Sequence, residues 1–190
     1  MVEVMKSGLK LRDSLRLIRN FKTTGTITPS STKLTERLLA SIDFSETLVI
    51  GELGPGNGCI TRAILDRMNK DSILLCLEVN QDFASELRSI DDSRLRVYNS
   101  CASSMQGVLD EIGVAKLDHI VSSLPLALIN EDLLSSILAS AQSNLKDGGR
   151  FLQYQYSLAN YWDMKPIFSD IKLKFTLRNM PPAFVYDCLK

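Results

Sequence analysis

The chain has 190 residues, 45% of them hydrophobic, which is enough for one globular domain with a single core. Lys and Arg together number 22, as do Asp and Glu, so no net charge recruits nucleic acid to the chain as a whole. The four cysteines are scattered without a CxxC pair, which argues against a metal site and favours a reducing compartment. No apolar run approaches the ~18 to 20 residues of a membrane-spanning helix, so we expect a cytoplasmic location.

The first segment, residues 1–22, has the pattern of a basic amphipathic helix. Leu11, Leu15 and Ile18 recur at spacings of four and three and share one face. Three arginines follow the same spacing beside that face: Arg12, Arg16 and Arg19. Such a helix either lies in a membrane interface or packs on a sheet with a solvated basic edge, and the pattern leaves both possibilities open.

Residues 23–46 are predicted to form a loop followed by a helix. Gly25 and Pro29 interrupt any regular pattern, and Ser30 or Ser31 is a candidate N-cap for a helix that ends near residue 42.

Strand and helix patterns alternate over the remaining segment, residues 47–190. Five strands are expected in “TLVIGEL”, “SILLCLEV”, “RLRVYN”, “LDHIVSS” and “RFLQYQYS”. The helices expected between and after them span residues 58–68, 81–90, 103–112, 131–145 (closed by “KDGG”) and 160–168. Two further strand patterns, “IKLKFTLR” and “AFVYDCL”, are joined only by “NMPP”, which predicts a hairpin. We therefore predict a single α/β domain, residues 1–190, with a mostly parallel seven-stranded sheet, a terminal antiparallel hairpin strand and helices on both faces.

A glycine turn with an adjacent acid separates the first strand from the next helix. Gly54, Gly56 and Gly58 alternate there, and such a turn lets backbone approach a ligand closely. The dinucleotide pattern GxGxxG requires glycine where Cys59 stands, and the phosphate loop GxxxxGK[ST] is absent. Glu52 precedes the turn, where a carboxylate would repel a pyrophosphate but attract a cationic ligand.

A second acid, Glu78, ends the second strand, 20 residues beyond Gly58. An acid at that position accepts hydrogen bonds from both ribose hydroxyls of an adenosine. S-adenosylmethionine carries an ammonium, a sulfonium and a free ribose diol but no phosphate, so the two acids and the turn favour it as cofactor. The alternative is that both acids are solvated strand ends and that the glycines only form a tight turn.

The stretch “ELGPGNG” is similar to the first motif of the class I S-adenosylmethionine-dependent methyltransferases, and Glu78 matches their ribose-binding acid. The resemblance implies a Rossmann-like fold, with S-adenosylhomocysteine as product, and implies that Glu52 holds the methionine amino group directly or through water. The Asp that often faces the adenine amine is replaced by Cys101, so backbone groups of Cys101 and Ala102 would supply that contact. The cofactor-binding residues implied in this way are Glu52, Gly54, Gly56, Asn57, Gly58, Glu78, Val79, Cys101, Ala102 and Ser122.

The fourth strand ends in “SSLPL”, and ligands in this fold bind beyond the carboxyl ends of the strands. The segment resembles the NLPY-type motif of amine methyltransferases, with Ser123 in the place of Asn; the alternative is a plain turn. The resemblance implies that Ser123, Leu124 and Pro125 position the acceptor amine, and Tyr156 is a further candidate. We assign no general base, and we expect His119 to be structural.

Three stretches, “FKTTGTITPSSTKL”, “SSLPL” and “NMPPAFVY”, together resemble the bacterial phospholipid N-methyltransferase family, which is related to the rRNA adenine dimethylases. The resemblance implies methylation of the amine of phosphatidylethanolamine by a peripheral protein on the inner face of the cytoplasmic membrane. Its loop over cofactor and substrate would contain Thr24, Gly25, Ile27, Pro29 and Ser30. Arg12, Arg16 and Arg19 would contact anionic lipid.

Three other functions stay open: an rRNA adenine dimethylase-like enzyme, a small-molecule or other amino-lipid N-methyltransferase, and a non-catalytic cofactor-binding domain. Dimethylases usually carry a further helical domain, whereas this sequence ends at Lys190, directly after the hairpin. Its balanced charge also offers no broad phosphate-binding surface. Both observations argue against a nucleic-acid substrate.

Overall fold

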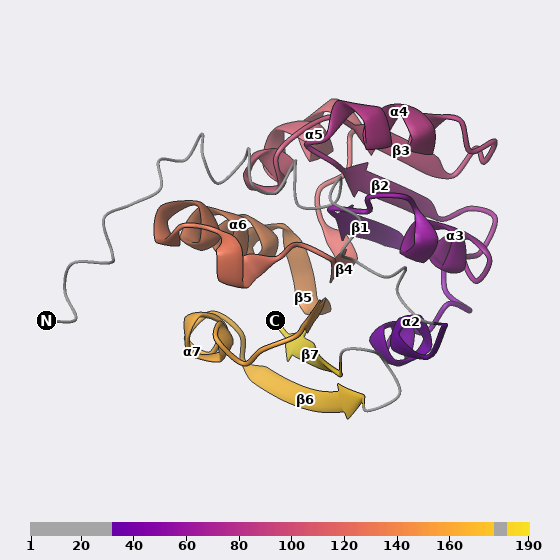
Figure 1. Cartoon of the computed structure of the whole chain (residues 1–190). Helices are drawn as coiled ribbons and strands as arrows, with labels where there is room; N and C mark the ends of the chain where they lie inside the picture. Colours follow the sequence, from indigo (N-terminus) through magenta and orange to yellow (C-terminus); the bar gives the residue numbers. More distant parts are fainter. Residues whose placement is uncertain (1–31, 177–181) are drawn as a thin grey trace, which may run out of the picture.

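A computed structural model describes residues 32–176 and 182–190 of the chain. The strands described form one sheet in the order β3-β2-β1-β4-β5-β7-β6, which runs from top to bottom in Figure 1. Their bounds are β1 (Val49–Leu53), β2 (Ile73–Leu77), β3 (Leu95–Tyr98), β4 (Leu117–Ser122), β5 (Leu145–Gln155), β6 (Asp170–Thr176) and β7 (Ala183–Leu189). The pairs from β3 to β5 are parallel, and β7 runs antiparallel to both β5 and β6. The predicted fold class, with its terminal hairpin strand, is confirmed.

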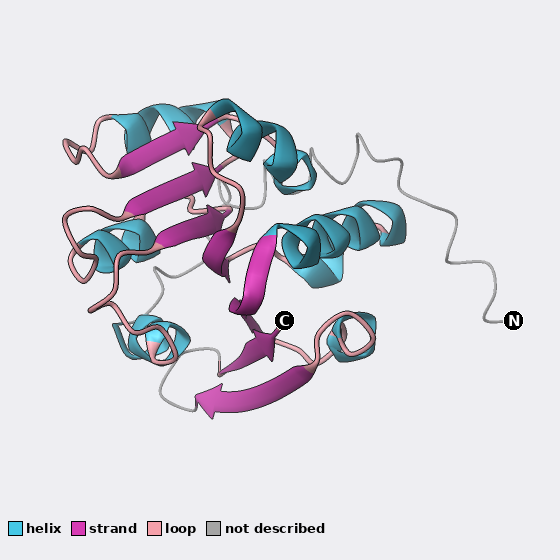
Figure 2. Cartoon of the chain, turned by 180° about the vertical axis from the view of Figure 1, so that it is seen from behind, coloured by secondary structure: helices cyan, strands magenta, loops and turns pink. Residues whose placement is uncertain are grey.

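Helices cover both faces of the sheet (Figures 1 and 2). On one face lie α2 (Thr32–Leu39), α3 (Cys59–Leu65) and α4 (Gln81–Arg88); on the other lie α5 (Met105–Glu111), α6 (Glu131–Asn144) and α7 (Tyr161–Met164). Two short 3₁₀ turns, η1 (Ala102–Ser104) and η2 (Leu126–Leu128), follow the ends of β3 and β4. Right-handed crossovers require this arrangement, because the chain reverses its direction across the sheet after β3.

The core consists of two apolar layers, one on each side of the sheet. Leu38 and Ile64 belong to the layer under α2 and α3, whereas Met105 and Leu138 belong to the layer under α5, α6 and α7. Central strands buried on both faces need nearly continuous apolar runs, which is why β2 reads ILLCL. In the described ranges, no helix combines the length and the hydropathy that crossing a membrane requires.

The predicted boundaries differ from the structure around β5. The “KDGG” segment was expected to close the preceding helix, but β5 already begins at Leu145, and α6 ends one residue earlier. Gly148 has a positive φ of 77°, and the pairing register between β4 and β5 shifts near Leu117. The two glycines therefore form an irregularity inside the start of the strand instead of a helix cap. The helix expected over residues 160–168 is also shorter, since α7 spans only Tyr161–Met164.

Two predicted features lie outside the described residues. These are the basic helix of residues 1–22, with the loop that follows it, and most of the “NMPP” connection in the hairpin.

Candidate cofactor and acceptor sites

The three alternating glycines form the turn between β1 and α3, and each has a positive φ: 68° at Gly54, 59° at Gly56 and 76° at Gly58. L side chains rarely adopt this conformation, so the turn depends on glycine. Gly54 N–H donates to the carbonyl of Leu77 over 2.9 Å, which fixes the turn against the end of β2. A Cβ at Gly58 would lie 2.8 Å from the Leu87 side chain, so α4 approaches the turn closely.

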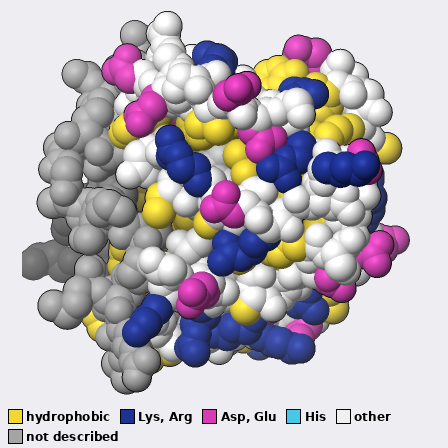
Figure 3. Space-filling model, turned by 90° about the vertical axis from the view of Figure 1, so that its right-hand side faces the viewer, with side chains coloured by type: hydrophobic (Ala, Val, Ile, Leu, Met, Phe, Trp, Pro, Cys, Tyr) yellow, Lys and Arg dark blue, Asp and Glu magenta, His cyan; other side chains and the backbone are white. Residues whose placement is uncertain are grey.

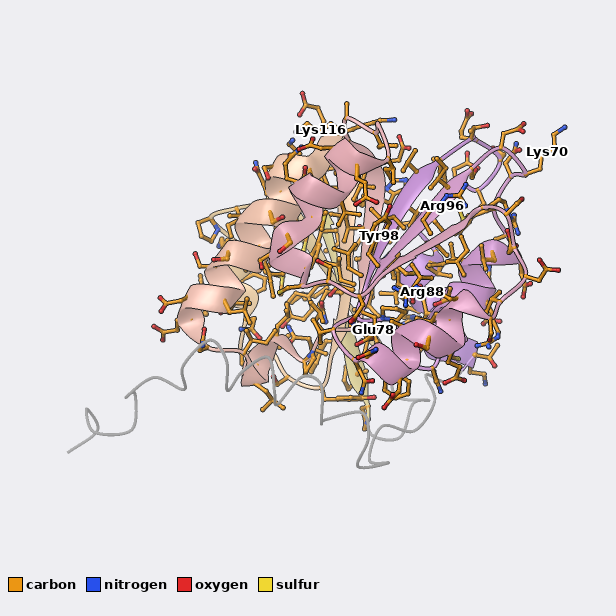
Figure 4. The ribbon with its side chains drawn as sticks, turned by 90° about the horizontal axis from the view of Figure 1, so that it is seen from above. Lys70, Glu78, Arg88, Arg96, Tyr98 and Lys116 are labelled. Carbon is orange, nitrogen blue, oxygen red and sulfur yellow. The ribbon has the colours of Figure 1, made fainter. Side chains whose placement is uncertain are left out.

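Glu78 follows β2 directly and is only 2% exposed. Its carboxylate accepts the backbone N–H groups of Gly56 and Asn80, each over 2.9 Å, and its carbonyl accepts the Asn99 side-chain amide over 2.8 Å. Figure 4 shows Glu78 near one end of the strands, whereas Lys70 and Lys116 lie toward the opposite end. The carboxylate is thus held in one orientation beside the glycine turn, at the carboxyl edge of the sheet.

A small hollow opens beside Glu78. Five predicted cofactor residues line it, namely Gly54, Glu78, Val79, Cys101 and Ala102. Leu124, which the sequence analysis assigned to the acceptor, also lines it, and three residues that the sequence analysis did not single out complete the lining: Leu77, Ser100 and Ile137. Leu77 and Ser100 are immediate neighbours of predicted residues, but Ile137 comes from α6, and no local motif marks it.

Glu52 lies within β1, directly before the turn, and is fully buried, so it is not the solvated strand end of the alternative interpretation. Its carboxylate accepts the Thr61 hydroxyl over 2.7 Å and the Cys76 thiol over 3.4 Å. Burial raises the pKa of Cys76 well above its usual value, and the charge of Glu52 raises it further, so the thiol stays protonated. Glu52 therefore lies beneath the turn and joins α3 to β1 and β2.

Asn57 is the predicted cofactor residue that lies most clearly apart from the hollow. It is exposed at the outside of the turn, and its side-chain oxygen accepts the N–H of Cys59 over 3.3 Å. That contact supports the first turn of α3. The structure gives Asn57 a local role in the loop.

The “SSLPL” turn after β4 is fixed to two neighbouring strands. Ser123 N–H donates to the Leu53 carbonyl over 2.9 Å, which joins the turn to β1. Leu124 N–H donates to the hydroxyl of Ser122 over 3.4 Å. Gln153 in β5 is fully buried, and its amide donates to the Leu124 carbonyl over 3.0 Å. Gln153 therefore positions the turn, a role that the sequence analysis missed because the contact joins residues 29 positions apart in the chain.

A second, larger hollow lies on the other side of this turn. All four predicted acceptor residues line it, together with five others: Ser123, Leu124, Pro125, Ala127, Leu128, Tyr154, Gln155, Tyr156 and Ser157. The hydroxyl of Ser123 and the amide nitrogen of Gln155 are buried without a hydrogen-bond partner among the described residues. Unpaired buried polar atoms are costly, so both suit a polar ligand. Leu124 lines both hollows, which are therefore adjacent.

The remaining predicted residues fall into two groups. The loop residues Thr24, Gly25, Ile27, Pro29 and Ser30 and the arginines Arg12, Arg16 and Arg19 lie outside the described residues. His119 lies within β4, paired with Ile50 and Arg150 near the amino ends of these strands, and burial lowers its pKa. It lines neither hollow, in keeping with the structural role expected for it.

Comparisons with known proteins identify one similar sequence and a common fold. No protein-family model matches the chain. It is 29% identical over 165 residues to an ornithine lipid N-methyltransferase of Singulisphaera acidiphila, covering 85% of this chain and 86% of that protein.

Solved structures of methyltransferases share the architecture at low sequence identity. A 1,6-didemethyltoxoflavin-N1-methyltransferase of Burkholderia thailandensis, solved with S-adenosylhomocysteine, has a TM-score of 0.68 at 14% identity and covers 94% of this chain and 86% of its own. The N-methyltransferase NodS of Bradyrhizobium japonicum has a TM-score of 0.65 at 11% identity, over 86% of this chain and 98% of its own. The chain thus has the fold of the class I S-adenosylmethionine-dependent methyltransferases.

Proposed function

We propose that the chain is an N-methyltransferase that moves a methyl group from S-adenosylmethionine to the amine of an amino lipid. The observation that carries this proposal is the adjacency of the two hollows at Leu124, one beside the glycine turn and Glu78, the other beside the “SSLPL” turn. The similarity to an ornithine lipid N-methyltransferase supports the choice of acceptor class.

The residues around the first hollow suit the adenosine of this cofactor chemically. The fixed carboxylate of Glu78 is an acceptor for ribose hydroxyls, and Gly54 lets the backbone approach the ligand without a side chain. Val79, Leu124 and Ile137 provide apolar surfaces for a flat base. No Lys or Arg lines this hollow in the described part of the chain, so nothing there matches a phosphate. When bound, S-adenosylmethionine supplies a methyl group activated by its sulfonium.

The second hollow provides an acceptor for an amine. The Ser123 hydroxyl is buried without a partner among the described residues, so it can accept an amine hydrogen and orient the lone pair toward the first hollow. Fixing the two reactants in this way can supply much of the rate acceleration. The hydrogen bond from the Gln153 amide to the Leu124 carbonyl keeps the turn in this position.

The acceptor amine has to lose a proton before it reacts. An ammonium like that of Lys has a pKa of about 10.4, so the neutral form costs roughly 4 to 5 kcal/mol at pH 7. Burial beside Pro125, Leu128 and Tyr154 lowers the pKa of an ammonium and offsets part of this cost. No carboxylate or histidine lines the second hollow in residues 32–176 or 182–190, and we assign no general base.

Within the amino lipids, phosphatidylethanolamine is the acceptor that the sequence resemblance favours, and ornithine lipid is the substrate in the name of the similar protein. Both present a primary amine on an acylated molecule. Figure 3 shows the side of the molecule that carries α3, where Lys and Arg are interspersed with Asp and Glu, so this side offers no broad basic surface to a nucleic acid.

Transfer of a radiolabelled methyl group tests the proposal. The full chain is incubated with labelled S-adenosylmethionine and, separately, with phosphatidylethanolamine or ornithine lipid in detergent micelles, with ethanolamine or ornithine in solution, and with ribosomal RNA. We expect label in the lipid phase. Label found only in RNA, or only in the soluble amines, would contradict the proposal.

A further inference from the structure

Exposed apolar side chains line the second hollow and continue in the chain segment that follows it. Leu128 and Tyr156 line that hollow and are also exposed, and the chain that continues from β5 exposes Leu158 and Trp162. We call these four residues the apolar rim. Trp162 is 72% exposed, which is unusual for the one tryptophan of a chain with a well-formed core.

Two further exposed apolar side chains lie on β6, the edge strand of the sheet. Leu173 and Phe175 in β6 pair through β7 with Gln153 and Gln155 of β5. Residues paired across neighbouring strands point to the same face, so both side chains lie on the face that carries α7. Figure 1 shows α7 beside β6 and β7 on this side.

Large exposed hydrophobic side chains are few. Within the described residues they number six, and they are the four of the apolar rim together with Leu173 and Phe175. Two of the six, Leu128 and Tyr156, line the second hollow, and Leu158 directly follows the lining residue Ser157, so exposed apolar surface accompanies this opening and marks an interaction surface.

The composition of the rim indicates what it contacts. The Trp162 ring packs edge-on against Tyr161 at 5.3 Å, and the Lys165 ammonium lies 5.1 Å from the Trp162 ring centre. The indole is therefore held in place, with a cation beside it. Tryptophan and tyrosine with a neighbouring lysine are typical of the boundary between acyl chains and anionic head groups.

We propose that the apolar rim contacts a lipid bilayer, so that the amino lipid enters the second hollow directly from the membrane. This inference rests on the proposed function, because a lipid acceptor has to reach the hollow across the rim. A protein bound to the rim would close that opening, whereas a bilayer supplies the acceptor through it. Lys165 complements the phosphates of the head groups at the same surface.

Vesicle binding by the full chain tests the surface. The variant carries Trp162→Ala with Lys165→Glu, neither of which lines a hollow. Its matched control is Lys70→Glu, an exposed lysine that Figure 4 shows toward the opposite end of the strands from Glu78. Both are compared with wild type by co-sedimentation with vesicles of phosphatidylethanolamine and phosphatidylglycerol. We expect at least about ten-fold weaker partitioning for the double variant, since each juxtamembrane charge changes affinity about five-fold, and no change for the control.

Methyl transfer to a short-chain amino lipid below its critical micelle concentration distinguishes a loss of membrane binding from a loss of catalysis. The double variant should keep wild-type turnover on this soluble substrate while it loses turnover on vesicles. Wild-type partitioning by the double variant, or no vesicle binding by wild type, would overturn the bilayer contact. If partitioning falls as expected but wild type methylates no amino lipid in any form, the bilayer contact is supported and the proposed function is refuted.

Discussion

Glu78 joins the glycine turn, the helix α4 and the first hollow through one carboxylate. Replacement by Gln keeps the shape but turns one acceptor oxygen into a donor and removes the charge. We expect Glu78→Gln to weaken binding of S-adenosylmethionine about 10- to 100-fold, the usual effect of losing hydrogen bonds to a charged group. Isothermal calorimetry measures the change. Glu86→Gln, at an exposed position of α4, is the control and should bind as wild type does.

Ser123 provides the second prediction at this scale, because its buried hydroxyl has no partner among the described residues and faces the acceptor hollow. Ser123→Ala should lower kcat for an amino lipid by about one order of magnitude or more through loss of amine orientation. The affinity for S-adenosylmethionine should stay the same. Ser157→Ala removes a hydroxyl from the more open side of the same hollow and should change kcat less than three-fold, roughly. A fall in cofactor affinity equal to the fall in kcat would refute a role in acceptor positioning.

The requirement for glycine in the turn between β1 and α3 can be tested by comparing alanine substitutions at a glycine of the turn and at a glycine inside a helix. Gly58 has a φ of 76°, and an added Cβ would lie 2.8 Å from both the Leu87 side chain and the Arg62 guanidinium. Gly107 lies in α5, and an added Cβ would meet nothing within 4 Å. We expect Gly58→Ala to lower the free energy of unfolding by about 1 to 3 kcal/mol and Gly107→Ala to raise it by about 0.5 to 1 kcal/mol. Urea unfolding measures both, and shifts of the same sign would contradict the structure.

The elements that the sequence predicted well are those with a local signal. Alternating strand and helix patterns and the spaced glycines gave the sheet and placed Glu78 beside the turn, as the structure has it. The site residues that the sequence did not predict owe their roles to contacts between segments far apart in the chain. Ile137 reaches the first hollow from α6, and Gln153 holds the acceptor turn from β5. Glu52 was placed correctly in the chain, but its burial against Thr61 and Cys76 depends on the packing of α3, which no spacing reveals.

On the scale of the whole molecule, both hollows follow from the order of the strands. The chain proceeds outward through β1, β2 and β3 and then returns to place β4 beside β1 on the other side. The loops after β1 and β4 leave in different directions from this point, and ligands of open α/β sheets bind there. The glycine turn and the “SSLPL” turn are these two loops, so the strand order itself brings the proposed methyl donor and acceptor together.

Asp187 in β7 is joined to β5, to β6 and to the segment after α2, and these contacts make the stability of the fold depend on pH. It is 2% exposed, forms ion pairs with Arg150 at 2.6 Å and Lys174 at 2.9 Å, and accepts the Ser41 hydroxyl. Burial alone would raise the pKa of Asp187, but the hydrogen bonds from Ser41, Lys174 and Arg150 outweigh burial and hold the pKa below its usual value. A carboxyl group with a lowered pKa in the folded state stabilises the fold fully above its unfolded pKa and loses this contribution as pH falls through the folded value.

We therefore expect Asp187→Asn to lower the free energy of unfolding at pH 7 by about 2 to 3 kcal/mol, because two cations lose their charged partner. The partial exposure of Arg150 and Lys174 keeps the loss below that of a fully buried pair. Below about pH 4 the wild type should lose stability more steeply than the variant, and the two curves should converge. Urea unfolding between pH 7 and pH 2 measures both curves. Asp147→Asn, at a side chain fully exposed to solvent, serves as the control and should follow the wild type at every pH. Parallel curves for Asp187→Asn and wild type would show that Asp187 does not carry the acid sensitivity.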